Sequence, residues 1–163
     1  MFVGPRMTGK SQFILNASKL QNFEDFTTIN QQIQEFGFKF RLIDSRSAEC
    51  SLVFLQYQFN SLIDQVVLVF NNNYFDLEEL DFFFLLSKKH LQSSKIKNQQ
   101  IILLCYGANK KVQMEDEINF AANNQLILIR SNYDQEQILQ ASCQICKICI
   151  YQRFKTEENN SMK

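Results

Sequence analysis

The sequence has few of the residues that break secondary structure, with one proline and four glycines in 163 residues. No stretch therefore has the composition of a linker, and we expect one domain rather than two. Histidine also occurs only once, which excludes a metal site built on a histidine pair. The five cysteines are an odd number, and three of them crowd residues 143 to 149, which favours reduced intracellular thiols over a disulfide framework.

An excess of charge of one sign is missing too. Lysine plus arginine and aspartate plus glutamate each number 17, so the chain lacks the basic surface to which nucleic acids and anionic membranes bind. No stretch approaches the length of a membrane span, the N-terminus lacks the pattern of a signal peptide, and the C-terminus lacks a prenylation cysteine. We expect a soluble cytoplasmic protein without a direct membrane anchor and without a nucleic-acid partner.

Apolar residues make up 45% of the chain, and they occur in strand-like and helix-like runs that alternate. This alternation is typical of a parallel sheet with helices on both of its faces. Gly37 separates two strand-like stretches and predicts an antiparallel hairpin. The predicted strands are residues 27–36 and 38–44 in the hairpin, then 66–70, 101–105 and 126–129, and the predicted helices include 10–20, 76–91 and 134–154.

We therefore predict an α/β fold with a mostly parallel six-stranded sheet, one antiparallel edge strand and helices on both faces. Residues 1–154 are expected to form this domain, and the polar residues 155–163 a disordered tail. Only Met1, Phe2 and Val3 precede the first glycine. The first strand is thus about half of the roughly 5–6 residues that strands usually have.

The segment from Gly4 to Ser11 reads Gly-Pro-Arg-Met-Thr-Gly-Lys-Ser and matches the phosphate-binding pattern G-x-x-x-x-G-K-[ST] in full. The glycines let backbone N–H groups turn towards phosphate oxygens, the lysine bridges the terminal phosphates, and the serine hydroxyl is a Mg²⁺ ligand. Two alternatives stay open: a chance strand, turn and helix, and a fold that has kept the loop but lost the ligand. The phosphate-binding residues that we predict are Gly4, Thr8, Gly9, Lys10 and Ser11.

With this loop between the first strand and the first helix, the order of elements resembles that of the small GTPases of the Ras and Rab type. The resemblance implies GTP or GDP with Mg²⁺ as the ligand, and it implies that Ser11, Thr28 and Asp44 hold the metal. In a Ras-type protein a glycine and a water-orienting glutamine follow the aspartate, whereas this chain has Ser47 and Ala48 there. Since an alanine offers no polar group to water, we expect little or no hydrolysis.

The same resemblance implies a base-reading motif, N-K-x-D, after the penultimate strand and a serine after the last one. Asn109, Lys110 and Ser131 match these places and are the base-binding residues that we predict, but Val112 replaces the aspartate. A valine cannot accept the two hydrogen bonds that the aspartate takes from guanine, and each unpaired buried donor costs about 1–3 kcal/mol. Guanine should therefore be preferred over adenine only modestly, if at all.

Three segments together make the resemblance more specific: residues 2–5 (Phe-Val-Gly-Pro) with residues 9–11 (Gly-Lys-Ser), residues 66–71 (Val-Val-Leu-Val-Phe-Asn) and residues 129–132 (Ile-Arg-Ser-Asn). They are similar to the Rab-like GTPase subunit of the intraflagellar transport B complex, a family with an atypical guanine motif and no lipid anchor. This likeness implies a nucleotide-binding structural subunit or pseudo-GTPase, bound to coiled-coil subunits in the cilium or flagellum. The alternative is an active GTP-hydrolysing switch in intracellular trafficking.

Five successive apolar residues, 82 to 86, lie inside a predicted helix. At about 100° per residue they surround the helix, whereas a helix packed on a sheet needs only one apolar stripe. We therefore predict that Phe82, Phe83 and Phe84 bind a partner protein, because contiguous exposed apolar side chains mark interaction sites. Aromatic side chains that are exposed without a partner are the alternative.

The last predicted helix contains three cysteines whose spacing is also found in zinc and iron–sulfur sites, namely Cys143, Cys146 and Cys149. On a helix, residues three apart drift around the axis, so three sulfur atoms do not easily converge on one ion. Free cysteine also packs as a small hydrophobic residue. We therefore predict that these cysteines extend the apolar face of the last helix.

Overall fold

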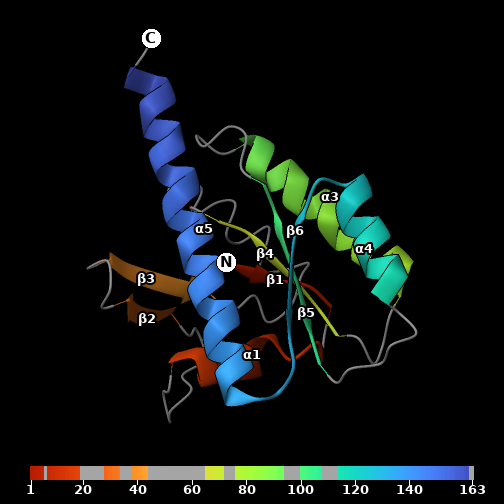
Figure 1. The fold of residues 1–163 in the computed structure, drawn as a ribbon. Coiled ribbons are helices and arrows are strands. Elements are labelled where there is room, and N and C mark those ends of the chain that lie inside the picture. Colours follow the sequence, from red (N-terminus) through yellow and green to blue (C-terminus); the bar gives the residue numbers. More distant parts are fainter. Residues whose placement is uncertain are drawn as a thin grey trace.

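The computed structural model describes residues 1–5, 7–18, 28–33, 38–43, 65–71, 76–93, 100–107 and 114–161. They form an α/β fold in which a parallel sheet lies between helices on both sides (Figure 1). The elements in chain order are β1 (Phe2–Val3), α1 (Lys10–Ser18), β2 (Thr28–Ile33), β3 (Phe38–Ile43), β4 (Val67–Phe70), α3 (Leu77–Ser93), β5 (Ile102–Tyr106), α4 (Met114–Asn123), β6 (Ile127–Ser131) and α5 (Gln135–Ser161).

The central sheet has four strands in the order β1-β4-β5-β6, and every neighbouring pair is parallel. Val67 of β4 lies opposite both Phe2 of β1 and Ile102 of β5, and Ile102 lies opposite Ile127 of β6. Because all four strands run the same way, their carboxyl ends meet at one edge of the sheet. In open sheets of this kind ligands bind outside that edge.

The prediction of one six-stranded sheet is not borne out by the described residues. β2 and β3 pair only with each other there, as a separate antiparallel ladder in which Thr28 lies opposite Ile43. The predicted hairpin is thus confirmed, but it forms its own two-stranded sheet. β1 has only two residues, and their described pairing is with β4, so this strand offers little length on which a further strand could pair.

Side chains alternate across the inner strands, and each face of the sheet has its own core. Val67 and Val69 pack with residues of α1 and α5, whereas Leu68 and Phe70 pack with residues of α3 and α4. A strand that is buried on both faces needs no polar alternation. This explains the continuous apolar runs from which β4 and β5 were predicted.

Two aspartates determine where α3 and α5 begin. Asp76 Oδ1 accepts the backbone N–H of Glu78 at 2.9 Å, and Asp134 Oδ1 accepts that of Glu136 at 2.9 Å. Such N-cap carboxylates satisfy amides that have no partner within the helix and also favour the positive end of its dipole. Both helices therefore start within one residue of the predicted positions.

The tail that was predicted to be disordered is helical as far as residue 161, since α5 extends from Gln135 to Ser161 and continues past the sheet (Figure 1). Adding a residue to an existing helix gains one hydrogen bond and avoids the cost of nucleation, so a polar segment without proline or glycine can continue it. An ion pair at i and i+4 supports this extension, with Arg153 Nε 3.4 Å from Glu157 Oε1.

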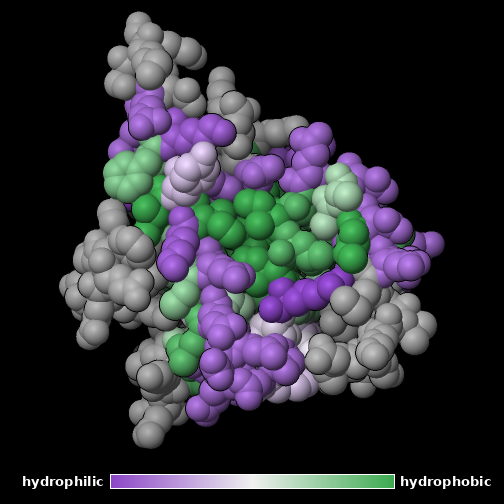
Figure 2. Space-filling model, in the orientation of Figure 1, coloured by the Kyte–Doolittle hydropathy of each residue, from purple (hydrophilic) through white to green (hydrophobic). Residues whose placement is uncertain are grey.

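β6 forms one edge of the described sheet and pairs there only with β5. Leu126, Ile127 and Leu128 are partly buried and pack against the two cores. Figure 2 shows a hydrophobic area on this face of the molecule, between α5 on one side and α3 and α4 on the other, with hydrophilic residues around it. The apolar side chains of this edge are thus covered less completely than those of β4 and β5.

Candidate functional site

The glycine loop lies at the carboxyl end of β1, and its first glycine is required by the neighbouring strand. Gly4 has a φ of +150°, and a Cβ atom on it would lie 2.1 Å from the carbonyl oxygen of Val69 in β4. That oxygen belongs to the backbone of a central strand and cannot move aside. Only glycine therefore allows the loop to start this close to β4.

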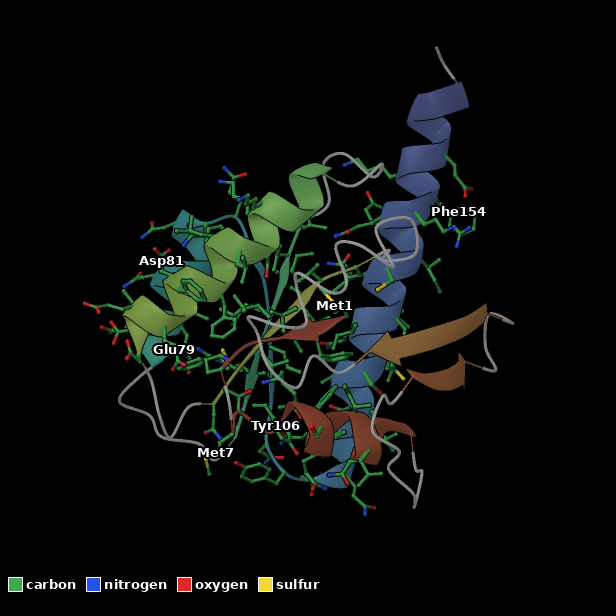
Figure 3. The ribbon with its side chains drawn as sticks, turned by 180° about the vertical axis from the view of Figure 1, so that it is seen from behind. Met1, Met7, Glu79, Asp81, Tyr106 and Phe154 are labelled. Atoms are coloured by element: carbon green, nitrogen blue, oxygen red, sulfur yellow. The ribbon has the colours of Figure 1, made fainter. Side chains whose placement is uncertain are left out.

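The second glycine is required by an aromatic ring. Gly9 has a φ of +83°, and a Cβ atom on it would come 2.8 Å from the ring of Tyr106, the last residue of β5. The backbone of the loop thus packs directly on the ends of β4 and β5. In Figure 3, Met7 at the tip of the loop and Tyr106 lie at the same end of the molecule, beside α1.

Lys10 is only 5% exposed, and its side chain returns to the first half of the loop. Its Nζ donates to the carbonyl oxygen of Gly4 at 2.9 Å, to that of Pro5, and to Thr8 Oγ1 at 3.3 Å. The Thr8 hydroxyl donates in turn to the carbonyl oxygen of Pro5 at 3.1 Å. A buried ammonium needs such partners, and here the loop itself provides them. The positive charge is therefore held in a fixed place inside the loop.

The first turn of α1 begins inside the loop, at Lys10 and Ser11. The N–H of Phe13 donates to the carbonyl oxygen of Gly9 at 2.8 Å, so the helical bonding starts at the second glycine. A helix N-terminus carries a partial positive charge and favours anions. The loop thus combines a helix N-terminus, a buried lysine and two glycines, which suits a phosphate group.

Met7 is the most exposed residue of the described loop, with 90% of its surface accessible. Its φ is 60°, in the left-handed region. A residue with a side chain pays roughly 1–2 kcal/mol for this conformation. Backbone strain of this kind is concentrated at ligand sites, because a loop shape that serves a ligand is retained despite its cost.

Of the remaining predicted site residues, the structure places Ser131 at the same edge of the sheet. Ser131 ends β6, is 4% exposed, and accepts the N–H of Gly107 with its carbonyl oxygen at 3.0 Å. Its hydroxyl donates to the carbonyl oxygen of Asn132 at 3.1 Å. Ser131 thus lies at the carboxyl edge of the sheet, and its hydroxyl is engaged with the neighbouring backbone.

The other predicted metal-binding and base-binding residues are not placed. Asp44, Asn109 and Lys110 lie outside the described residues, as do Ala48 and Val112, which carried the expectations on hydrolysis and base preference. Thr28 begins β2, but only its backbone is described. The structure therefore places the residues of the predicted phosphate site and Ser131 at one edge of the sheet, and all metal ligands, Ser11 included, stay predictions.

Two tyrosines at this edge were missed by the sequence analysis. Tyr106 is fully buried, and its ring contacts the rings of Phe13 and Tyr133 edge to face, at centroid distances of 5.4 and 4.9 Å. Burial raises the pKa of Tyr106, and the nearby Asn16 side chain acts in the opposite direction. No hydrogen bond of ordinary geometry reaches its hydroxyl from the described residues. The only signal in the sequence was an aromatic residue before Gly107 at the end of a buried strand.

The prediction of a partner surface at Phe82, Phe83 and Phe84 is wrong for two of the three. Phe83 and Phe84 are 6% and 5% exposed and belong to the core under α3. Phe82 is 52% exposed, and the next exposed apolar residue on this helix is Leu85 at 55%. Successive helix positions point in different directions, so a run of five apolar residues contributes to both the core and the surface.

The three cysteines of α5 differ in burial. Cys146 is 2% exposed and thus buried, Cys149 is partly buried and packs against the core between the sheet and α5, and Cys143 is exposed. The predicted core position is confirmed for Cys146 and does not hold for Cys143. Among the residues that the structure describes, no group of three or more potential metal ligands is close enough to hold an ion.

Comparison with known proteins does not add to this picture, since the sequence matches no known protein family and no characterised protein. In the described part of the chain, no helix has the length and apolar character needed to cross a lipid bilayer.

Proposed function

We propose that the loop from Gly4 to Ser11 binds the phosphates of a nucleoside di- or triphosphate. The observation that carries this proposal is the fit of the loop to the sheet: both glycines occupy places where a Cβ atom would collide, at 2.1 and 2.8 Å from its neighbours. A turn that joins a strand to a helix by chance does not require two positions at which only glycine fits. The buried ammonium of Lys10 between them adds the charge that a phosphate requires.

In this proposal the residues of the loop have separate roles. The backbone amides of the loop and the first turn of α1 surround the phosphates, and Lys10 contacts the terminal ones. Ser11, together with Asp44 and Thr28, would hold Mg²⁺, which neutralises phosphate charge when it is bound. Asn109, Lys110 and Ser131 would contact the base. The geometry of the described loop supports the phosphate assignment, while the roles of Thr28, Asp44, Asn109 and Lys110 rest on the sequence alone.

We infer from Ala48 and Val112 that binding outweighs turnover, so the chain acts as a divergent Rab-like GTPase or pseudo-GTPase. Its proposed role is that of a structural or adaptor subunit of a larger assembly, with coiled-coil partners in the intraflagellar transport B complex of the cilium. The exposed side chains of Phe82 and Leu85 support a contact with another protein. Assignment to this complex rests on the sequence resemblance alone.

Nucleotide binding is tested by identifying the ligand that remains after gentle purification and by titrating the protein with GDP, GTP and ADP in Mg²⁺. Lys10→Ala should weaken binding roughly ten- to hundredfold, because it removes a charge-assisted contact to phosphate. Lys147→Ala, at an exposed position of α5, is the matched control and should bind as the parent does. If Lys10→Ala and the parent bind equally tightly, the phosphate site is elsewhere.

Hydrolysis and assembly need separate measurements. Turnover at the rate of an ordinary small GTPase, abolished by Lys10→Ala, would favour the active switch over the structural subunit.

For the assembly, Phe82→Ser should reduce recovery of the coiled-coil subunits in a pull-down, while Tyr151→Ser on α5 should not. Undiminished recovery with Phe82→Ser would move the contact away from α3, and absence of these subunits even with the parent protein would reject the proposed complex.

A further inference from the structure

Tyr133 is a half-exposed aromatic residue in the short segment between β6 and α5, with 51% of its surface accessible. The backbone on both sides of it is held in place. Asn132 Oδ1 accepts the N–H of Asp134 at 2.7 Å, and the N–H of Asn132 donates to Gln137 Oε1 at 3.3 Å. The ring is thus presented from a rigid position and not from a loose loop.

The ring of Tyr133 reaches across the carboxyl edge of the sheet. It starts after the end of β6, its centroid lies 4.9 Å from that of Tyr106 at the end of β5, and its hydroxyl lies 3.5 Å from Nδ2 of Asn71, directly after β4. Asn71 itself is 5% exposed. One side chain therefore covers the ends of three parallel strands, which is the place where sheets of this kind bind ligands.

Tyr106 connects this ring to the phosphate loop. Cδ1 and Cε1 of Tyr106 lie 2.8 Å from where a Cβ atom on Gly9 would be, and the same ring contacts Tyr133 at an interplanar angle of 83°. A single aromatic ring thus separates Tyr133 from the loop. In a nucleotide a single ribose separates the base from the first phosphate, so the spacing suits a base at Tyr133 when the phosphates are in the loop.

We propose that Tyr133 is the surface on which the base of the nucleotide stacks. An edge-to-face contact with Tyr106 leaves part of the Tyr133 ring uncovered, which agrees with its exposure. Stacking on an aromatic ring accepts every base, because every base has a π-face. The site would thus take nucleoside phosphates of either purine, consistent with Val112 in place of the guanine-reading aspartate.

This assignment rests on the phosphate site proposed above, and the test must separate the two. The affinities of the parent, Tyr133→Leu and Tyr133→Phe are measured by calorimetry for GDP, ADP and inorganic pyrophosphate in Mg²⁺. Pyrophosphate reports on the loop alone, and the nucleotides report on the loop and the base together. Tyr151→Leu, a similarly exposed tyrosine on α5, is the matched control.

Tyr133→Leu should bind both nucleotides roughly 5- to 150-fold more weakly, the range that corresponds to the loss of about 1–3 kcal/mol of base stacking. Its affinity for pyrophosphate should stay that of the parent, and Tyr133→Phe and Tyr151→Leu should bind nucleotides normally. Unchanged nucleotide affinity in Tyr133→Leu, or an equal loss for nucleotides and pyrophosphate, would overturn the role of Tyr133 while leaving the loop assignment intact. If the parent binds neither nucleotides nor pyrophosphate, both proposals fail.

Discussion

Tyr106 lies so close to Gly9 that a Cβ atom on residue 9 would come 2.8 Å from its ring. The ring is fully buried and is also held by Phe13, so it has little freedom to turn away. The shape of the glycine loop and the packing at the end of β5 therefore depend on each other.

Gly9→Ala should lower the free energy of unfolding by about 2–5 kcal/mol. The left-handed conformation costs a residue with a Cβ atom roughly 1–2 kcal/mol, and the forced contact with the ring adds about 1–3 kcal/mol. The same substitution should cost less in a Tyr106→Val background, where the ring is absent. Urea denaturation of the four proteins gives this coupling directly. Equal costs in both backgrounds would show that the ring does not restrict residue 9.

Gln125→Gly should stabilise the protein by up to about 1 kcal/mol, because Gln125 has a φ of 55° where α4 ends. The N–H of Leu126 donates to the carbonyl oxygen of Ala121 at 2.8 Å, and that of Gln125 to Ala122 at 3.2 Å, the bonds of a Schellman motif. Gln125→Ala is the control and should give no gain, since alanine meets the same strain. A midpoint in urea that does not rise for Gln125→Gly would contradict this account.

Arg130→Ala should destabilise the protein more than Glu117→Gln. Glu117 is 1% exposed and accepts Arg130 Nε at 3.1 Å, whereas a third of the Arg130 side chain is accessible. Removing the arginine leaves a buried carboxylate without its ion pair, which typically costs 3–5 kcal/mol. Removing the carboxylate charge leaves a guanidinium that water can reach. Chemical denaturation at pH 7 compares the two, and a larger loss for Glu117→Gln would reverse this assignment of the buried charge.

Stability should fall as the pH rises from about 9 towards 12, because burial raises the pKa of Cys146 from 9.0 to about 12. In that window the unfolded chain releases the thiol proton while the folded chain keeps it. The unfolded state therefore binds fewer protons, and stability declines by at most about 1.4 kcal/mol per pH unit for this group. Burial also raises the pKa of Cys105 well above 9.0, which adds to the decline.

Unfolding free energies measured in reductant at pH 8 to 11 test this expectation. Cys146→Ala should flatten the decline, and Cys143→Ala, at an exposed position of the same helix, is the control. An identical slope for the parent and Cys146→Ala would mean that other groups determine the alkaline limit.

The strands β4 and β5 and the helices α1, α3 and α5 could be predicted because their signals are local. A strand buried on both faces is a continuous apolar run, and an aspartate before a helix is an N-cap. The separation of β2 and β3 from the central sheet could not be predicted, because strand pairing joins residues far apart in the chain. The periodicity of the sequence also does not predict that Phe83 and Phe84 are buried while Phe82 is exposed. The burial of each ring depends on how α3 is rotated about its axis on the sheet.

The glycine loop could be recognised in the sequence because its glycines, lysine and serine occur at the fixed spacing of a known pattern. The sequence did not predict that Tyr106 and Tyr133 lie beside this loop, because an aromatic residue at the end of a strand is usually part of the core. Their relation to the loop depends on the parallel arrangement of β1, β4, β5 and β6, which brings residues 9, 106 and 133 to one edge.

The position of Arg130 in β6 has a consequence for solubility as well as for stability. An apolar edge strand is a template for pairing with another copy of the chain, and proteins commonly interrupt such edges with a charged residue. Arg130 is the only charged residue of β6, which otherwise reads Ile-Leu-Ile before it and Ser after it. Glu117 holds its guanidinium in place, so the ion pair also keeps a charge fixed at this edge. Loss of the arginine would thus favour edge-to-edge aggregation at high protein concentration, and light scattering would detect this before any unfolding is seen.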